Sequence, residues 1–183
     1  MADIDWLEKM QSTLTPARVA HSLGVAETGA ELAAYYDEEP ERARLAGIVH
    51  DLAREMRPAD MLAEALMRKL PMERIERQAP VLLHGPIEAS RLAEDGLRDP
   101  DILQAVRLHT TGAPGMGRLA QIIFLSDAIE PTREFPGVDE LRAMAKDGLR
   151  VAVAACLRMQ LVYLASQGHL IHPRAVATYN SFI

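Results

Sequence analysis

The sequence predicts an all-α fold, and its composition is the first reason. Aromatic residues make up only 4% of the 183 positions, while alanine, leucine and methionine are plentiful, which favours helices packed on helices over a sandwich rich in valine and tyrosine. The second reason is that apolar residues recur at helical spacing, with no convincing strand, hairpin or repeat. With 49% apolar residues, the chain has material for the core of one compact domain, expected over residues 1–183.

Proline sets most of the expected helix boundaries, because it suits the first turn of a helix and ends the helix before it. Thr15-Pro16 is the clearest start signal, with threonine as the N-cap. Gly85-Pro86 predicts a break beside His84, and Pro86 then suits the first turn of the next helix. The expected helices cover about residues 4–14, 16–36, 40–54, 57–69 and 72–78, a stretch beginning at Pro86, then 99–109, 119–129, 139–146 and 148–167, and a last helix after Pro173.

One segment is clearly a loop. HTTGAPGMGRL, which begins at His109, contains three glycines and a proline, and glycine permits turns and a close approach of the backbone to a ligand. We expect backbone amides around Gly112 to approach a phosphate there. The alternative is a loop whose glycines only permit the turn.

Net charge and cysteine usage exclude several classes of protein. The formal net charge is −6 and the isoelectric point about 5.5, which excludes a broad nucleic-acid surface but leaves room for a local basic pocket. The single cysteine, Cys156, excludes an internal disulfide and fits a cytoplasmic location. No apolar run approaches the roughly 20 residues that cross a bilayer, so no membrane partner is expected.

The most informative pair is His50-Asp51, which closes an apolar stretch in ARLAGIVHDLAREM. Buried imidazole and carboxylate groups need compensation, and a metal ion satisfies both. His21 and Asp127 interrupt apolar helical patterns in the same way. We therefore expect the four to converge on one metal ion. The alternatives are that each histidine is an ordinary hydrogen-bonded residue and that Asp127 caps a helix end.

The ordered set resembles a known family. RVAHSLGV, AGIVHDLARE and IIFLSDAIEP are similar to the H…HD…D signature of HD-domain metal-dependent phosphohydrolases. LLHGP, LHTTGAPGMGRLAQIIFLSDAIEPTREFPGVDELR and GHLIHPRAVATYN resemble the YqeK-type HD family. The resemblance covers approximately residues 18–180 and implies a single HD domain. It also implies symmetrical hydrolysis of diadenosine tetraphosphate to two ADP.

The resemblance also implies site residues. Iron is the expected ion, with manganese or another divalent transition metal as alternatives, and either Asp51 or His84 accepts a proton from water. The implied metal ligands are His21, His50, Asp51 and Asp127. The implied nucleotide and phosphate contacts are Arg18, His21, Asp51, Arg54, His84, His109, Asp127, Arg133, Ile171, His172 and Pro173.

Several points stay open. His84 and His109 resemble phosphate contacts, although histidines at comparable places hold a second metal in some other HD enzymes. Leu52 and Arg54 stand where the family commonly has tyrosine and lysine, which puts fine substrate preference in doubt. The second nucleoside of a dinucleotide is expected between the HTTG loop and the C-terminal segment.

The expected partner is a small dinucleoside polyphosphate or ADP, and a homodimer is left open. One alternative is another HD phosphohydrolase, such as a nucleotidase acting on monophosphates or a triphosphatase. The other is a nucleotide-sensing module without turnover, which would keep the basic pocket but lack hydrolysis.

Overall fold

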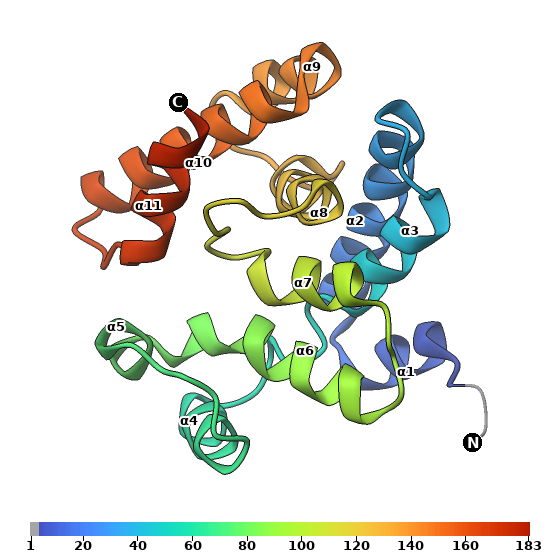
Figure 1. Ribbon diagram of the computed structural model, residues 1–183, viewed down its shortest axis with the longest axis vertical. Helices are drawn as coiled ribbons and strands as arrows, with labels where there is room; N and C mark the ends of the chain where they lie inside the picture. Colours follow the sequence, from blue (N-terminus) through green and yellow to red (C-terminus); the bar gives the residue numbers. More distant parts are fainter. Residues whose placement is uncertain (1–3) are drawn as a thin grey trace.

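The computed structural model describes residues 4–183, and these form helices with no strand among them, confirming the predicted all-α class (Figure 1). The elements are α1 (Trp6–Thr13), α2 (Pro16–Tyr35), α3 (Pro40–Val49), α4 (Pro58–Met67), α5 (Arg74–Gln78), the 3₁₀ helix η1 (Pro80–Leu83), α6 (His84–Glu94), α7 (Pro100–Leu108), α8 (Arg118–Ile129), α9 (Val138–Asp147), α10 (Leu149–Ser166) and α11 (Pro173–Phe182).

Helix α8 forms the centre of the main core. It packs against α2, α3, α7, α9 and α10 and lies between them in Figure 1. A helix that is apolar on nearly every side is typical of such a position, and Ile122, Ile123 and Leu125 are fully buried. Asp127, in the last turn of α8, is therefore held in place by the core, with 23% of its side chain exposed.

A second, smaller apolar cluster lies beside the main core. It is formed by Ala53, Met61, Ala65, Leu83 and Ile87, from α4, η1, α6 and the segment that follows α3. This cluster packs η1 and the start of α6 against α4. The position of His84, the first residue of α6, follows from that packing.

Proline begins α2, α3, α4, α7 and α11, as the sequence predicts. Thr15 is the N-cap residue of α2 and Pro16 begins the helix, as predicted, but the Thr15 side chain makes no cap hydrogen bond. The backbone N–H and the hydroxyl of Thr15 both donate to the carboxylate of Glu55 instead. The predicted break beside His84 falls where η1 ends at Leu83 and α6 begins. Pro86 lies in the first turn of α6, as expected, where a missing N–H is harmless.

Helix α3 is shorter than predicted. The sequence pattern extends it to residues 51–54, but it ends at Val49 and residues 50–55 form turns. Gly47 permits the close contact of α3 with α2, since a Cβ there would lie 2.5 Å from Ala26 Cα. The early end turns His50 and Asp51 toward the first turns of α2.

Helix α10 corrects another expectation. It has 18 residues with a mean hydropathy of 1.4, so its length and composition alone would allow it to cross a membrane. The prediction that no apolar run approaches that length is wrong here. One side of α10 packs against α8, α9 and α11 and buries Val153 and Leu157. Only 33% of the helix is buried inside the structure, and one helix of this kind is weak evidence for a membrane span.

Candidate metal centre

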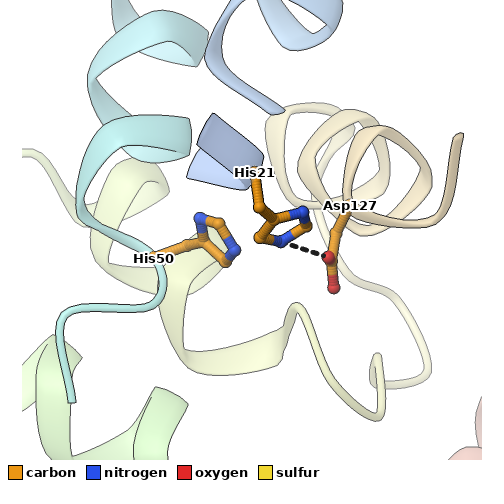
Figure 2. Close-up of side chains that lie close together, drawn as sticks. All are labelled: His21, His50 and Asp127. Atoms are coloured by element: carbon orange, nitrogen blue, oxygen red, sulfur yellow. Dashed lines mark ion pairs between the residues drawn. The ribbon is translucent and has the colours of Figure 1, made fainter. Parts of the chain in front are cut away.

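The structure brings the four predicted ligands together. His21 comes from α2, His50 and Asp51 follow α3, and Asp127 comes from α8. Figure 2 shows the side chains of His21, His50 and Asp127 directed toward one another. His21 Nε2 lies 3.1 Å from Asp127 Oδ1 and 3.8 Å from Asp51 Oδ2, and His50 Nε2 lies 3.5 Å from Asp51 Oδ2. Residues more than a hundred positions apart therefore share one centre.

The same local geometry orients three of the histidine rings. Nδ1 of His50 donates to the carbonyl of Gly47, Nδ1 of His109 donates to that of Val106, both at 2.7 Å, and Nδ1 of His84 donates to the carbonyl of Val81. In each case the acceptor is three residues earlier, at the end of a helical turn. Because Nδ1 carries a proton in each ring, Nε2 is the nitrogen left to bind a cation or a further proton.

His21 is oriented by a carboxylate instead. Its Nδ1 donates to Glu130 Oε1 at 3.0 Å, and Glu130 also accepts from the backbone N–H and hydroxyl of Thr132. Glu130 is fully buried. Gly24 makes room for this carboxylate, since a Cβ there would lie 2.6 Å from Glu130 Oε2. A carboxylate behind a histidine fixes its tautomer and makes its free nitrogen a better metal ligand.

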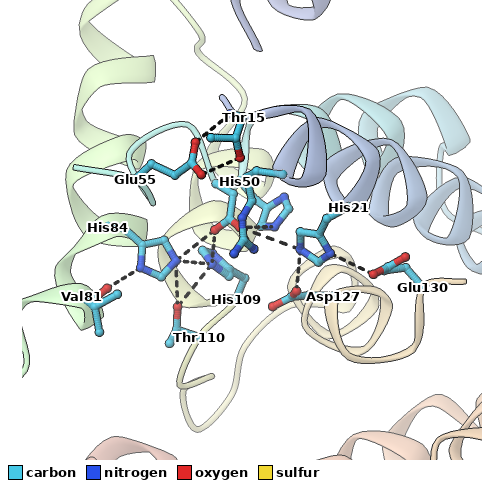
Figure 3. A network of polar contacts seen from close by, with 12 residues as sticks. Thr15, His21, His50, Glu55, Val81, His84, His109, Thr110, Asp127 and Glu130 are labelled. Carbon is cyan, nitrogen blue, oxygen red and sulfur yellow. Dashed lines mark hydrogen bonds and ion pairs between the residues drawn. The ribbon is translucent and has the colours of Figure 1, made fainter. Parts of the chain in front are cut away.

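Figure 3 shows the rings of His21, His50, His84 and His109 gathered around one centre. The carboxylate of Asp51 lies within 3.8 Å of the Nε2 atoms of all four. Asp51 Oδ1 lies 3.2 Å from His84 Nε2 and 3.6 Å from His109 Nε2, while Oδ2 faces His21 and His50. The Nε2 atoms of His84 and His109 are 2.8 Å apart. Two lone pairs tolerate that separation only if one ring gains a proton or a cation lies nearby.

These residues fit a divalent metal ion. Among residues 4–183, the Nε2 atoms of His21 and His50 are buried without a satisfied hydrogen bond, although buried polar atoms are nearly always paired. His21, His50 and Asp127 offer donor atoms within 4.8 Å of one another, as do His50, Asp51 and His109. Mixed imidazole and carboxylate donors suit iron, manganese or zinc better than magnesium.

Two arginines neutralise the carboxylates. Arg18 donates to Asp51 Oδ2 at 2.9 Å, and Arg133 donates to Asp127 Oδ1 at 2.6 Å. Burial alone would raise the pKa of Asp51, but the charge of His50 and hydrogen bonds from neighbouring histidines hold that pKa far below its usual range. The pKa of Asp127 is likewise lowered, because the contact with His21 outweighs burial. Both carboxylates are therefore ionised and able to bind a cation.

Three cavities meet at this centre. The central cavity has a volume of about 210 Å³. Most of the predicted phosphate contacts line it, namely Arg18, Asp51, Arg54, His84, His109, Asp127 and Arg133. An apolar cavity of about 370 Å³ shares Val81, Leu82 and Thr110 with it. A polar cavity of about 500 Å³ shares Arg18 and Arg133 with it.

Of the three predicted nucleotide contacts near the C-terminus, only one lines a cavity. His172 lines the apolar cavity, but Ile171 and Pro173 do not. His172 is also committed to structure: its Nδ1 accepts from the backbone N–H of Arg174, and its Nε2 lies 3.3 Å from Glu76 Oε1. Leu170 and His169 contribute to the lining instead, because the chain turns before α11 at these residues.

The expectation for Gly112 is wrong. Its backbone N–H already donates to the carbonyl of Leu108 at 2.7 Å and is not free for a phosphate. Gly112 has a φ of +61°, and a Cβ there would lie 2.7 Å from Thr178 Cγ2. Glycine is therefore required for the turn and for contact with α11. Leu52 belongs to the main core rather than to the cavity lining.

Sequence reasoning missed Glu130 and Thr110. Glu130 follows Asp127 by one helical turn and ends the same apolar run, so an acidic residue at that spacing was a usable signal. The hydroxyl of Thr110 lies 3.4 Å from His84 Nε2 and 3.3 Å from His109 Nε2. No sequence pattern distinguishes Thr110 from Thr111 beside it.

Comparisons with known proteins agree with this geometry. The HD domain family matches residues 18–132, a span that holds all four predicted ligands. A structure from Clostridium acetobutylicum, described as a predicted HD superfamily hydrolase involved in NAD metabolism, superposes with a TM-score of 0.92 at 34% identity and covers 97% of this chain and 94% of that one. The chain belongs to the HD-domain family.

Curated relatives narrow the family further. A symmetrical bis(5'-nucleosyl)-tetraphosphatase of Halalkalibacterium halodurans is 39% identical over 178 residues, which are 97% of this chain and 95% of the relative. One of Bacillus subtilis is 36% identical and covers 93% of this chain and 92% of its own. The chain belongs to the family of symmetrical bis(5'-nucleosyl)-tetraphosphatases, which confirms the YqeK-type resemblance of its motifs.

Proposed function

We propose that this protein is a metal-dependent hydrolase that cleaves diadenosine tetraphosphate at its middle to give two ADP. The observation that carries the proposal is the convergence of open histidine nitrogens on Asp51, beside two arginines in one cavity. Family membership over nearly the whole chain supports the same reaction.

The metal ligands are His21, His50, Asp51 and Asp127, and iron is the proposed ion, with manganese as the alternative. When bound there, such an ion lowers the pKa of a water molecule and polarises a phosphoryl oxygen. The buried Nε2 atoms of His21 and His50 support this assignment. His84 and His109 then contact phosphate, although the donor group of His50, Asp51 and His109 keeps a second ion as the alternative.

Of the two candidates for the proton acceptor, we assign His84 rather than Asp51. The pKa of Asp51 is held far below its usual range, so this carboxylate is a weak base. Burial lowers the pKa of His84, which keeps its imidazole neutral near pH 7. Its Nδ1 is occupied by the carbonyl of Val81, so Nε2 is the atom that takes the proton. A base must also lie within hydrogen-bond reach of that proton, and Nε2 faces the cavity shared with Asp51.

Negative charge that develops on the phosphates is met by Arg18, Arg54, His109 and Arg133. Fixed cations beside a transferring phosphoryl group stabilise its transition state. The three permanent cations, Arg18, Arg54 and Arg133, matter more than the net charge of the chain at distances below the roughly 8 Å Debye length.

The apolar cavity receives one adenosine. Val81, Leu82, Leu164 and Leu170 line it together with Thr110 and other residues. Apolar walls with a few polar groups are typical of small-molecule sites, and a volume of about 370 Å³ falls within the usual range.

Product analysis tests this function. Protein purified without oxygen and loaded with iron or manganese is incubated with diadenosine tetraphosphate, and the products are separated by chromatography. We expect two ADP per substrate and none with His50→Ala. Inorganic phosphate or triphosphate from other nucleotides would instead indicate a different HD phosphohydrolase. Tight ADP binding without turnover would indicate a sensing module.

A further inference from the structure

The HTTG loop and the C-terminal segment line the same cavity. Thr110 and Thr111 meet Leu170 and His172 around the apolar cavity. The sequence predicts the second nucleoside between these two segments, but that is the apolar cavity, which we assign to the first nucleoside. A symmetrical substrate has a nucleoside at each end of its phosphate chain, so the second nucleoside needs a different space.

The polar cavity offers that space on the opposite side of the metal centre. It shares no lining residue with the apolar cavity, but it shares Arg18 and Arg133 with the central one. Its volume of about 500 Å³ suits a nucleoside. The three cavities thus follow the order of the substrate: nucleoside, phosphates, nucleoside.

The polar cavity is lined by two arginines and three glutamates, of which Glu130 is already paired with His21. Arg18 and Arg133 also line the central cavity, whereas Glu55, Glu134 and Phe135 line only the polar one, and we call these three its outer part. Carboxylates repel further phosphates but accept hydrogen bonds from ribose hydroxyls and base amino groups. The outer part is therefore suited to an uncharged polar group rather than to more phosphate.

Phe135 gives this outer part an aromatic surface. Its side chain is 37% exposed although it is large and apolar, and it lines the cavity beside Glu134. Nucleobases stack on exposed aromatic rings with little regard to base identity.

We propose that the polar cavity is the subsite for the second nucleoside, which stacks on Phe135 and donates hydrogen bonds to Glu134. This inference rests on the proposed function, because it assigns the half of the dinucleotide that the apolar cavity does not hold. Arg18 and Arg133 contact the phosphates that join the halves.

Binding measurements on metal-free protein test the subsite without hydrolysis. Wild type and Phe135→Ala are titrated with diadenosine tetraphosphate and with adenosine 5'-tetraphosphate, which has only one nucleoside. We expect wild type to bind the dinucleotide about tenfold tighter, and Phe135→Ala to lose that preference while keeping its affinity for adenosine 5'-tetraphosphate within about twofold. Phe135→Tyr, which retains the ring, should keep the preference.

Leu170→Ala in the apolar cavity is the matched control and should weaken both ligands. Equal affinity of wild type for the two ligands, or an unchanged preference in Phe135→Ala, would overturn the subsite. A separate assay of the metal-loaded protein for ADP release judges the proposed function. A protein that prefers the dinucleotide through Phe135 but releases no ADP would retain the subsite and refute the hydrolase.

Discussion

Two buried histidine–glutamate pairs lie in different regions of this molecule and serve different ends. His21 pairs with Glu130 between α2 and the end of α8, and His172 pairs with Glu76 between α11 and α5. All four side chains are nearly or fully buried. In composition and burial the pairs are alike, so neither property alone identifies a functional histidine.

The two pairs differ at the histidine nitrogen that does not face the glutamate. His172 Nδ1 accepts from the backbone N–H of Arg174 while its Nε2 faces Glu76, so both nitrogens are used. His21 uses Nδ1 for Glu130 and leaves Nε2 without a satisfied hydrogen bond beside Asp127. A buried histidine with one satisfied nitrogen, and one open nitrogen directed at carboxylates, has the geometry that a metal ligand needs.

The largest effect is expected at the open nitrogens. His50→Ala should remove the metal and lower hydrolysis by about 1000-fold, or ~4 kcal/mol of activation free energy. Metal analysis and steady-state kinetics on the same preparation measure both. His172→Asn, which changes the fully satisfied histidine, should retain the metal. Loss of metal in both variants to the same degree would break the distinction between the two regions.

Glu88 is a third buried glutamate, and it differs from Glu130 and Glu76 because it has no histidine partner. Burial, the largest cause, raises the pKa of Glu88 to about 7, and its Oε2 has no hydrogen-bond partner among residues 4–183. The folded state therefore holds a proton that the unfolded state loses above its ordinary pKa of 4.5. The contribution of Glu88 to the free energy of unfolding should be fully present below that pH and fall by about 3 kcal/mol as pH rises to about 7.

Urea unfolding of wild type and Glu88→Gln across this range measures the effect. The glutamine variant should lose most of the pH dependence, whereas metal affinity should be unchanged. A pH profile that is the same in both proteins would show that Glu88 carries a charge in the folded state. A buried carboxyl oxygen without a hydrogen bond, with only Arg91 at 3.8 Å, is thus a cost in stability.

Glu130 and Glu76, the carboxylates of the two histidine–glutamate pairs, can be compared directly by the same substitution. Glu130→Gln should lower metal affinity by about 10- to 100-fold, since a carboxylate behind a ligand histidine raises its basicity. Glu76→Gln should leave metal affinity unchanged and lower the free energy of unfolding by about 1–3 kcal/mol. Metal titration and chemical unfolding of both variants distinguish these outcomes. Equal metal affinity in Glu130→Gln and wild type would remove the positioning role.

The smallest effect is expected at Arg133, which lies outside the first pair and donates to Asp127. Arg133→Ala should weaken ADP binding about tenfold, because a charged contact to phosphate is lost, while the metal content stays intact. Calorimetric titration with ADP measures it, and Arg57→Ala, an exposed arginine paired with Asp60, is the control. Unchanged ADP affinity in Arg133→Ala would limit this residue to holding Asp127.

Much of the fold could be read from the sequence, because proline acts locally. A proline at N1 restricts its own backbone whatever surrounds it, and Pro16, Pro40 and Pro100 each begin a helix. The end of α3 at Val49 could not be read. The apolar pattern continues past it, and the contacts of α3 with α2 and α7 are tertiary.

In the candidate site, too, the sequence predicts some features, whereas others depend on tertiary contacts. The convergence of His21, His50, Asp51 and Asp127 was predictable, because each interrupts an apolar pattern in the sequence. The orientation of their rings was not, because it depends on carbonyl acceptors and on Glu130, which only the fold brings to Nδ1. The three cavities were also beyond the sequence, since each combines residues from distant segments.

The most direct measurement is an anomalous difference map from crystals grown without oxygen, with data collected at the absorption edge of the bound metal. We expect one strong peak between Nε2 of His21 and Nε2 of His50, in contact with the carboxylates of Asp51 and Asp127. A peak elsewhere, or protein that turns over substrate with no peak at this centre, would contradict the proposal that these four side chains hold the catalytic ion.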